Sequence, residues 1–339
     1  RLRPVRHHVP QTSPCSAPPC SAPQAHMSAP SAVLSAWCVE HLGSAAIEEF
    51  FTASSMSSVH GLRLADDRRV AVKIRAYAPR LLACLEAQRS AIEAGILAPR
   101  PLAGPVEFGV DGQFACAEEW MDDGVPQPAT DAAEHYGQLG AALVLALSGL
   151  EPAAFAPPPP WFDVQHGDDT RIWPPAASPR WDPHAIDLPA WLPAFATRAR
   201  ARMIAADALA LPLAVGHCDL TGLNTRWVLR QDEAWQPIVH DWDSIAGLPA
   251  ALLAGGLAMD YIADGSGGIA SIAQGERVLA AFAAGLGRDW SATERHVAWA
   301  AGTWVACYNA AFEFLHGGAG AVSAQLKHDG EERLRRAGC

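Results

Sequence analysis

The chain has 339 residues, of which 50% are hydrophobic and 18% charged, enough apolar material for one large or two modest domains. Its net charge of -11 argues against general nucleic-acid binding, which needs a basic surface, and is compatible with a cationic partner. The longest apolar run, about residues 248–259, is too short to span a bilayer, and the eight scattered cysteines indicate free thiols in a reducing, cytoplasmic compartment.

Residues 1–32 form the first segment, which contains Pro, Ser, Ala, Arg and His but no acidic residue and no apolar periodicity. Such a segment cannot bury enough apolar surface to become ordered, so we expect a disordered tail. Met27 is a candidate for the native start of the chain, and a basic transit peptide is the alternative interpretation of the residues before it.

Residues 33–118 predict a small lobe. Near-helical apolar spacing predicts a helix over residues 33–51. A small, polar segment follows, and then two apolar strands that we expect to form a hairpin, at residues 59–64 and 69–75. Lys73 lies on the second of these strands between apolar neighbours. A helix over residues 79–95 and two further strands over residues 100–120 complete this lobe.

Residues 119–326 predict a larger, mainly helical lobe. Helical patterns occur at residues 132–150, 188–209, 248–263, 274–286 and 291–315. The Pro-rich segment 151–193 lacks periodicity and carries Trp and Asp residues. These side chains either bind a cationic or sugar-like ligand or fasten an irregular loop to the core. Residues 327–339 are expected to be a polar tail.

The stretch over residues 215–244 combines two acids and an amide on loops beside short strands. Asp219 and Asn224 lie five positions apart on a Gly-containing turn, and Asp241 follows an apolar strand. The segments between them predict a hairpin, whose open ends would bring these three side chains together. Phosphoryl transfer needs such a set, because one carboxylate orients the acceptor hydroxyl while an amide oxygen and a second carboxylate hold Mg²⁺.

The spacing of this stretch follows the catalytic loop of protein kinases, His-x-Asp with a later Asn and then an Asp that opens the metal loop. Here it reads His217-x-Asp219-x4-Asn224, followed by Asp241-Trp242-Asp243. The stretch resembles the aminoglycoside phosphotransferase and choline-kinase-like enzymes, whose usual pattern is His-Gly-Asp-x4-Asn and then Ile-Asp-Trp/Phe-Glu/Asp. Two positions depart from that pattern, Cys218 for the usual Gly and Thr221 for the usual His or Ser.

The resemblance implies an α+β, two-lobed protein-kinase-like fold. It also implies an enzyme that uses ATP or GTP together with Mg²⁺. The acceptor would be a small-molecule hydroxyl on an aminoglycoside-like compound, an amino alcohol or a sugar. In that family pattern, Asp219 would deprotonate the hydroxyl and His217 would position the catalytic loop. Asn224 and Asp241 would bind Mg²⁺, and Asp243 would be a second metal ligand or support the first.

The same resemblance assigns residues to the nucleotide. Lys73 would contact the phosphates with Glu86 as its acidic partner, and Glu93 is the alternative partner. Glu119, Trp120 and Met121, where the last small-lobe strand ends, would lie near the nucleotide. The family pattern also implies that Asp260 supports the catalytic loop from the core.

Two other functions remain open from the sequence. The first is a non-catalytic nucleotide- or ligand-binding module of the same fold, which Cys218 keeps open. The second is a protein kinase, which is disfavoured because the chain has neither an Ala-Pro-Glu nor an Asp-Phe-Gly segment. The sequence does not indicate an oligomeric state.

Overall fold

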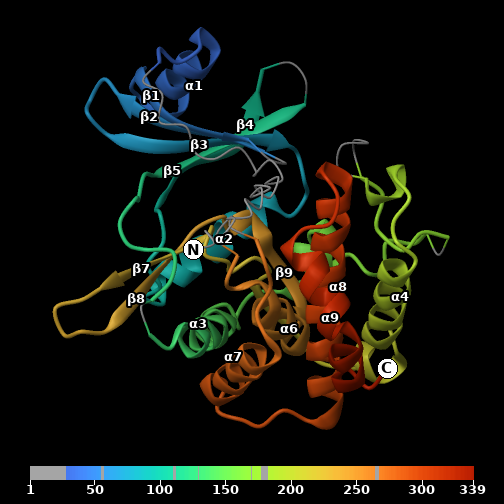
Figure 1. Ribbon diagram of the computed structural model, residues 1–339. Helices are drawn as coiled ribbons and strands as arrows, with labels where there is room; N and C mark the ends of the chain where they lie inside the picture. Colours follow the sequence, from blue (N-terminus) through green and yellow to red (C-terminus); the bar gives the residue numbers. More distant parts are fainter. Residues whose placement is uncertain are drawn as a thin grey trace, which may run out of the picture.

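The computed structural model describes residues 28–54, 57–109, 112–128, 130–168, 170–176, 182–263 and 267–339. Most of the tail expected at residues 1–32, with the candidate start at Met27, lies outside these residues. Of the part that is described, Ser28 forms an antiparallel bridge with Glu49 of the sheet. A β-sheet with helix α1 lies above a larger, mostly helical body, and α2 lies below the sheet, beside that body (Figure 1). The predicted two-lobed α+β arrangement is confirmed.

The small lobe is built on a five-stranded antiparallel sheet with the strand order β1-β2-β3-β5-β4. Strand alternation gives this sheet one apolar face, which packs with α1 into a core of its own that includes Val70 and Val72. The opposite face carries Lys73 toward the larger lobe. The strands are β1 Ala46–Ser54, β2 Ser58–Leu64, β3 Arg69–Ala76, β4 Pro101–Phe108 and β5 Gln113–Glu119.

The predicted helix over residues 33–51 is wrong in its second half. Helix α1 covers only Ala32–Leu42 and ends at Gly43, whose φ of 73° is a left-handed conformation that stops the helix. The chain continues as β1, in which residues 46–54 pair with β2. Over so short a segment, the apolar spacing fits both the helical period of 3.6 residues and the strand period of 2. Pairing with β2 makes the segment a strand.

Helix α2 (Leu81–Glu93) follows the sheet strands in sequence but packs toward the larger lobe. Its buried residues Cys84, Ala87 and Ala91 belong to the larger hydrophobic core. The guanidinium of Arg80, just before the helix, contacts the carbonyl oxygen of Asp243. The helix therefore connects the sheet to the loop that carries Asp241 and Asp243.

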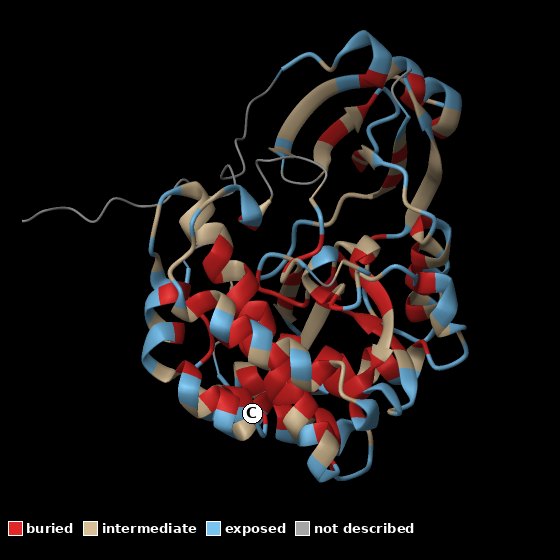
Figure 2. Cartoon of the chain, turned by 90° about the vertical axis from the view of Figure 1, so that its right-hand side faces the viewer, coloured by how far each residue is buried: buried red, intermediate tan, exposed pale blue. Residues whose placement is uncertain are grey.

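The larger lobe contains most of the buried residues (Figure 2). Helix α6 packs against α8 at its centre, and α3, α4, α7 and α9 surround this pair. The helices are α3 Ala132–Ala146, α4 Trp191–Met203, α5 Ala206–Leu209, α6 Ala250–Asp260, α7 Ile272–Gly285, α8 Ala292–His316 and α9 Ala321–Arg336. The expected polar tail at residues 327–339 is wrong, because these residues continue α9 and bury Arg333 and Leu334.

Two short antiparallel strand pairs belong to the larger lobe and contribute buried residues to its core. They are β6 (Leu213–His217) with β9 (Ile245–Pro249), and β7 (Thr225–Leu229) with β8 (Trp235–Val239). Four 3₁₀ helices complete the described structure, η1 Pro152–Phe155, η2 Pro160–Phe162, η4 Pro183–Ala185 and η5 Trp242–Ser244. Within the described ranges, no helix has both the length and the hydrophobicity needed to cross a membrane.

Candidate active site

The predicted hairpin between the two motif loops is present, and it brings their ends together. Strands β7 and β8 pair from Thr225 opposite Val239 to the turn. Just beyond the paired ends, the backbone N–H of His240 donates to the carbonyl oxygen of Asn224 at 2.8 Å. A second backbone bond, from Cys218 N to Ser244 O at 2.8 Å, ties the catalytic loop to the loop that follows β8.

Asp219 and Asn224 face each other within the catalytic loop. The amide nitrogen of Asn224 donates to Asp219 Oδ2 at 2.7 Å and to the Asp219 carbonyl oxygen at 3.1 Å. Burial raises the pKa of Asp219 to about 6, although the Asn224 hydrogen bond and the charge of Lys73 oppose this shift. The carboxylate is therefore ionised at neutral pH yet basic enough to accept a proton.

His217 is buried below this loop and joins it to strand β8. Its Nε2 donates to the carbonyl oxygen of His240 at 2.9 Å, and its Nδ1 accepts from the backbone N–H of Asp219 at 3.0 Å. Burial lowers the pKa of His217 to about 4, so the ring is neutral and can play both roles at once. The ring thus holds the backbone of Asp219 and is not placed to exchange protons at neutral pH.

Asp241 and Asp243 form an ion-pair cluster with cations of β3. Lys73 Nζ contacts Asp241 Oδ1 and lies 2.6 Å from Asp243 Oδ1, and Arg75 pairs with the other oxygen of Asp243. Ser244 Oγ donates to Asp241 Oδ2 at 3.0 Å. Asp241 has a φ of 59°, a left-handed conformation that is uncommon outside glycine and frequent at functional sites.

The structure does not place Glu86 beside Lys73. Helix α2 turns Cys84 and Gln88 inward, and residues two positions away from them, such as Glu86, lie on the opposite, exposed face. Glu93 is exposed for the same reason. The predicted partner is therefore wrong, and Lys73 is paired with Asp241 and Asp243 instead.

Two cavities meet at this cluster. The first, of about 360 Å³, lies under the sheet and is lined by Glu119, Trp120 and Met121, the three residues predicted to lie near a nucleotide. The second, of about 620 Å³, opens on the larger lobe and is lined by Asp219 and Asp260. Residues common to the two linings include Lys73, Asn224 and Asp241.

Asp260 has a different position from the one that the sequence predicted. Its carboxylate accepts a hydrogen bond of 3.2 Å from Asn309, and it lines the second cavity beside Tyr308 and Phe312. Burial raises the pKa of Asp260 to about 7, with a further contribution from the charge of Asp219. The structure shows no hydrogen bond from Asp260 to the described residues of the catalytic loop, so the expected support of that loop is not observed.

The structure places two tryptophans of the Trp-rich segment in different surroundings. Trp173 is fully buried and lies 4.9 Å from Trp304 between ring centroids, so it fastens the segment to α8. Trp161 lines the second cavity, and its indole N–H donates to the carbonyl oxygen of Cys218 at 3.4 Å. Trp181 lies outside the described residues.

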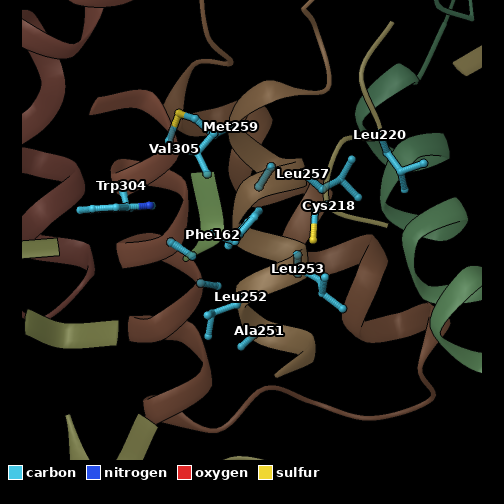
Figure 3. Packing of buried hydrophobic residues seen from close by; sticks show 14 of the residues in the cluster. Phe162, Cys218, Leu220, Ala251, Leu252, Leu253, Leu257, Met259, Trp304 and Val305 are labelled. Atoms are coloured by element: carbon cyan, nitrogen blue, oxygen red, sulfur yellow. The ribbon is translucent and has the colours of Figure 1, made fainter. Parts of the chain in front are cut away.

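Cys218 replaces the Gly of the family pattern without disturbing the site. Its side chain points into the core of the larger lobe near Leu253, Leu257 and Phe162 (Figure 3). Burial raises the pKa of this thiol, so it stays neutral. The substitution thus adds an apolar contact behind the catalytic loop and leaves Asp219 facing the cavity.

Among the site residues that were missed from the sequence are Arg75, Gln88 and Glu118. All three line the first cavity. The alternation of β3 and β5 could have found two of them, because Lys73, Arg75 and Glu118 lie on the strand face opposite the buried valines and alanines. The helical phase of α2 could have found Gln88, which shares the inward face with Cys84.

The oxygen atoms of Asn224 and Asp241 suit a magnesium ion. Mg²⁺ is usually bound by one or two carboxylates, with water and substrate phosphates completing its shell. Asn224 directs its amide nitrogen to Asp219, which leaves its oxygen available as a ligand. Among the described residues, no group of three or more His, Cys, Asp or Glu side chains is arranged to hold a metal.

Comparisons with protein-family models and with curated protein sequences gave no match. Solved structures do match. The amicoumacin kinase hAmiN, in complex with AMP-PNP, Ca²⁺ and Ami, matches with a TM-score of 0.58 at 12% identity. The match covers 84% of this chain and 87% of the chain of that kinase. A microcompartment-associated aminopropanol kinase has a TM-score of 0.54 at 14% identity, with 84% and 87% covered. Aminoglycoside phosphotransferase APH(4)-Ia has a TM-score of 0.53 at 12% identity, with 90% and 98% covered. The chain therefore shares the kinase-like fold of these small-molecule phosphotransferases.

Proposed function

We propose that this protein is a cytoplasmic small-molecule kinase that transfers the γ-phosphoryl group of ATP or GTP to a hydroxyl group, with Mg²⁺. One observation carries the proposal: two cavities meet at Lys73, Asn224 and Asp241, and Asp219 lines only the second. A nucleotide in the first cavity would direct its terminal phosphate to this junction. An acceptor in the second would meet the phosphate beside Asp219.

Each residue has a role that its contacts support. Asp219 accepts the proton of the acceptor hydroxyl and orients its oxygen toward phosphorus, and His217 keeps the Asp219 backbone in place. Lys73 binds phosphate oxygens. Asn224 and Asp241 hold the metal, and a bound Mg²⁺ neutralises negative charge on the phosphates. Most of the rate acceleration would come from this positioning and charge neutralisation.

Asp243 differs from Asp241 in its surroundings. Its two carboxylate oxygens face Lys73 and Arg75, so neither is directed at the second cavity. We therefore assign Asp243 to holding these two cations in place. Of the two roles that the sequence left open, this favours support of the site over direct metal binding.

The acceptor is proposed to be cationic. Beyond Asp241 at its junction with the first cavity, the second cavity is lined by the carboxylates of Asp219 and Asp260 and by the aromatic side chains of Trp161, Tyr308 and Phe312. Carboxylates and aromatic faces both attract an ammonium group. Two proteins of the same fold are named for nitrogen-containing acceptors, the aminopropanol kinase and the aminoglycoside phosphotransferase. We infer that the acceptor carries a hydroxyl to be phosphorylated and an amine near Asp260.

The experiment is an acceptor screen with purified full-length protein, Mg²⁺ and ATP or GTP. Release of ADP or GDP would be measured with amino alcohols, aminoglycosides and matched uncharged polyols, and phosphorus NMR would identify the ester product. We expect turnover with amine-bearing acceptors. Binding of Mg·ATP without turnover of any acceptor would favour the non-catalytic module instead.

A further inference from the structure

The cleft face of the sheet carries a carboxylate that none of the assigned roles uses. In the β3–β5 pair, Lys73 lies opposite Cys116 and Ala71 lies opposite Glu118. Lys73 and Glu118 are therefore diagonal neighbours on one face, a separation that long side chains bridge. Both line the first cavity.

Glu118 is held from the side by helix α2. Gln88 is 4% exposed, and its amide nitrogen donates to Glu118 Oε2 at 2.9 Å and to the carbonyl oxygen of Pro99 at 2.8 Å. Both amide hydrogens are thus used, which fixes the orientation of Gln88. The Gln88 amide can donate a hydrogen bond to Glu118, which a second carboxylate could not do. Helix α2 therefore supports Glu118, and strand β5 supplies the negative charge.

The charge of Lys73 favours the charged form of Glu118 at this position. Burial raises the pKa of Glu118, and the Gln88 hydrogen bond and the positive charge of Lys73 oppose that rise. The charge of Lys73 thus adds to the shared sheet face and to the hydrogen bond from Gln88.

We propose that Glu118 on strand β5, held by Gln88, is a second positioning carboxylate of Lys73 beside Asp243, in the role that the resemblance assigned to Glu86 on the helix. The inference rests on the proposed function, because Lys73 must bind nucleotide phosphates for its position to matter. Asp241 cannot give the same oxygen to Lys73 and to a metal ion. When Asp241 binds Mg²⁺, Glu118 would hold Lys73 from the sheet, while Asp243 holds it together with Arg75 from the loop after β8.

Calorimetric binding of Mg·ATP and of adenosine to the full-length protein tests this role. Glu118→Gln keeps the side-chain shape and can still accept from Gln88, but it loses the charge. We expect Mg·ATP to bind about ten- to a hundredfold more weakly, since hydrogen bonds to charged groups are worth that much, and adenosine to bind as before. Glu118→Asp should recover part of the loss, and Glu107→Gln, an exposed position on β4, should change neither affinity.

A double-mutant cycle separates positioning from other roles. In a Lys73→Met background, Glu118→Gln should weaken Mg·ATP binding no further. If Glu118→Gln weakened adenosine binding as much as Mg·ATP binding, Glu118 would contact the base. If Glu118→Gln weakened Mg·ATP binding as much in the Lys73→Met background as in the parent, Glu118 would act independently of Lys73. Loss of Mg·ATP binding in Glu86→Gln but not in Glu118→Gln would return the role to the helix. Each of these results would overturn the inference.

Urea unfolding without nucleotide distinguishes this inference from the proposed function. The four proteins compared are the parent, Glu118→Gln, Lys73→Met and the double variant. If Glu118 and Lys73 interact, the double variant should unfold at a higher urea concentration than the two single changes predict by addition. Additive midpoints would overturn the pairing. Coupled midpoints in a protein that binds no Mg·ATP would retain the Lys73–Glu118 pair and reject the kinase function.

Discussion

The side-chain amide of Asn224 directs both of its hydrogens at Asp219, one to the carboxylate at 2.7 Å and one to the backbone carbonyl at 3.1 Å. This geometry fixes the amide, so its oxygen points away from Asp219. One residue thus orients the proposed base and presents a ligand to the proposed metal. Asn224 thus keeps the proposed base and the proposed metal side by side. That arrangement suits in-line transfer of a phosphoryl group from a bound nucleotide to a bound acceptor.

Asp219→Asn should remove catalysis and spare nucleotide binding. The variant keeps the shape of the side chain but cannot accept the acceptor proton. General-base catalysis contributes about a hundred- to ten-thousandfold, so kcat should fall in that range while the Kd for Mg·ATP stays nearly unchanged. ADP release and calorimetric titration measure the two quantities. Asp232→Asn, at an exposed position in the turn of the same hairpin, is the control, and parental turnover by Asp219→Asn would contradict the proposed base.

Asp241→Asn should weaken metal-dependent nucleotide binding. Asn tolerates the left-handed conformation of this position, with φ of 59°, so the fold should be retained. Replacing the carboxylate by a neutral amide weakens this metal ligand, and we expect Mg·ATP to raise the melting temperature of the parent much more than that of the variant. Asp289→Asn, exposed in the turn before α8, should behave as the parent. Equal stabilisation of parent and variant by Mg·ATP would rule out the metal assignment.

Asp260 should make acceptor binding depend on pH. Its pKa of about 7 means that the carboxyl is largely neutral at pH 6 and ionised at pH 8. The KM of a cationic acceptor should therefore fall as pH rises through about 7, because an aliphatic amine, with a pKa of about 10, stays protonated. Asp260→Asn should raise KM at pH 8 and abolish this dependence. An uncharged acceptor is the control, and the same pH profile with that acceptor would show that Asp260 does not bind the amine.

The same carboxyl should destabilise the fold at high pH. Its pKa lies above the usual 3.8 in the folded protein, so the folded state binds the proton more tightly than the unfolded state. Its contribution to stability is complete below about pH 4 and is lost as pH rises toward about 7. Asp260→Asn should increase the free energy of unfolding at pH 8, by on the order of 1 to 2 kcal/mol after allowance for partial exposure. A variant less stable than the parent at pH 8 would contradict this.

Gly255→Ala should destabilise the larger lobe. A Cβ at this position of α6 would collide with the backbone carbonyl oxygen of Ala298 on α8, so the two helices would have to separate. Overpacking of this kind costs about 1 to 3 kcal/mol, measurable by urea unfolding. Gly149→Ala is the matched control, because its Cβ would meet no atom within 4 Å. A Gly255→Ala protein as stable as the control would show that the helix pair yields easily.

Several parts of the site could be predicted because they depend on short-range geometry. The hairpin between Asn224 and Asp241 follows from two strands and a turn, and it closes its ends whatever surrounds it. The strands that carry Lys73 and Glu119 also follow from local pattern, and the resemblance assigned Lys73, Glu119, Trp120 and Met121 to the nucleotide. Their roles in catalysis and nucleotide binding stay predictions until tested.

Other features could not be predicted, because spacing along the chain does not specify which face a residue occupies or what packs on it. Glu86 has a suitable sequence distance from Lys73, but the phase of α2 turns it to solvent and Gln88 to the cleft. Asp260 lies in an apolar helix, as a residue of the core would, but the packing of α6 on α8 directs it to the cavity beside Asn309. The segment after residue 326 is polar in sequence, and α8 supplies the surface that makes it a helix.

The sequence by itself determined the motif, its chemistry and the hairpin that assembles Asp219, Asn224 and Asp241, because these depend on one short, continuous stretch of the chain. Only the tertiary structure decided the cationic side of the site. Lys73 and Asp241 are 168 positions apart, and their contact exists because the sheet docks over the larger lobe. The partners of Lys73 and the walls of the acceptor cavity come from elements whose side chains meet only after that docking, and no local pattern encodes their distances.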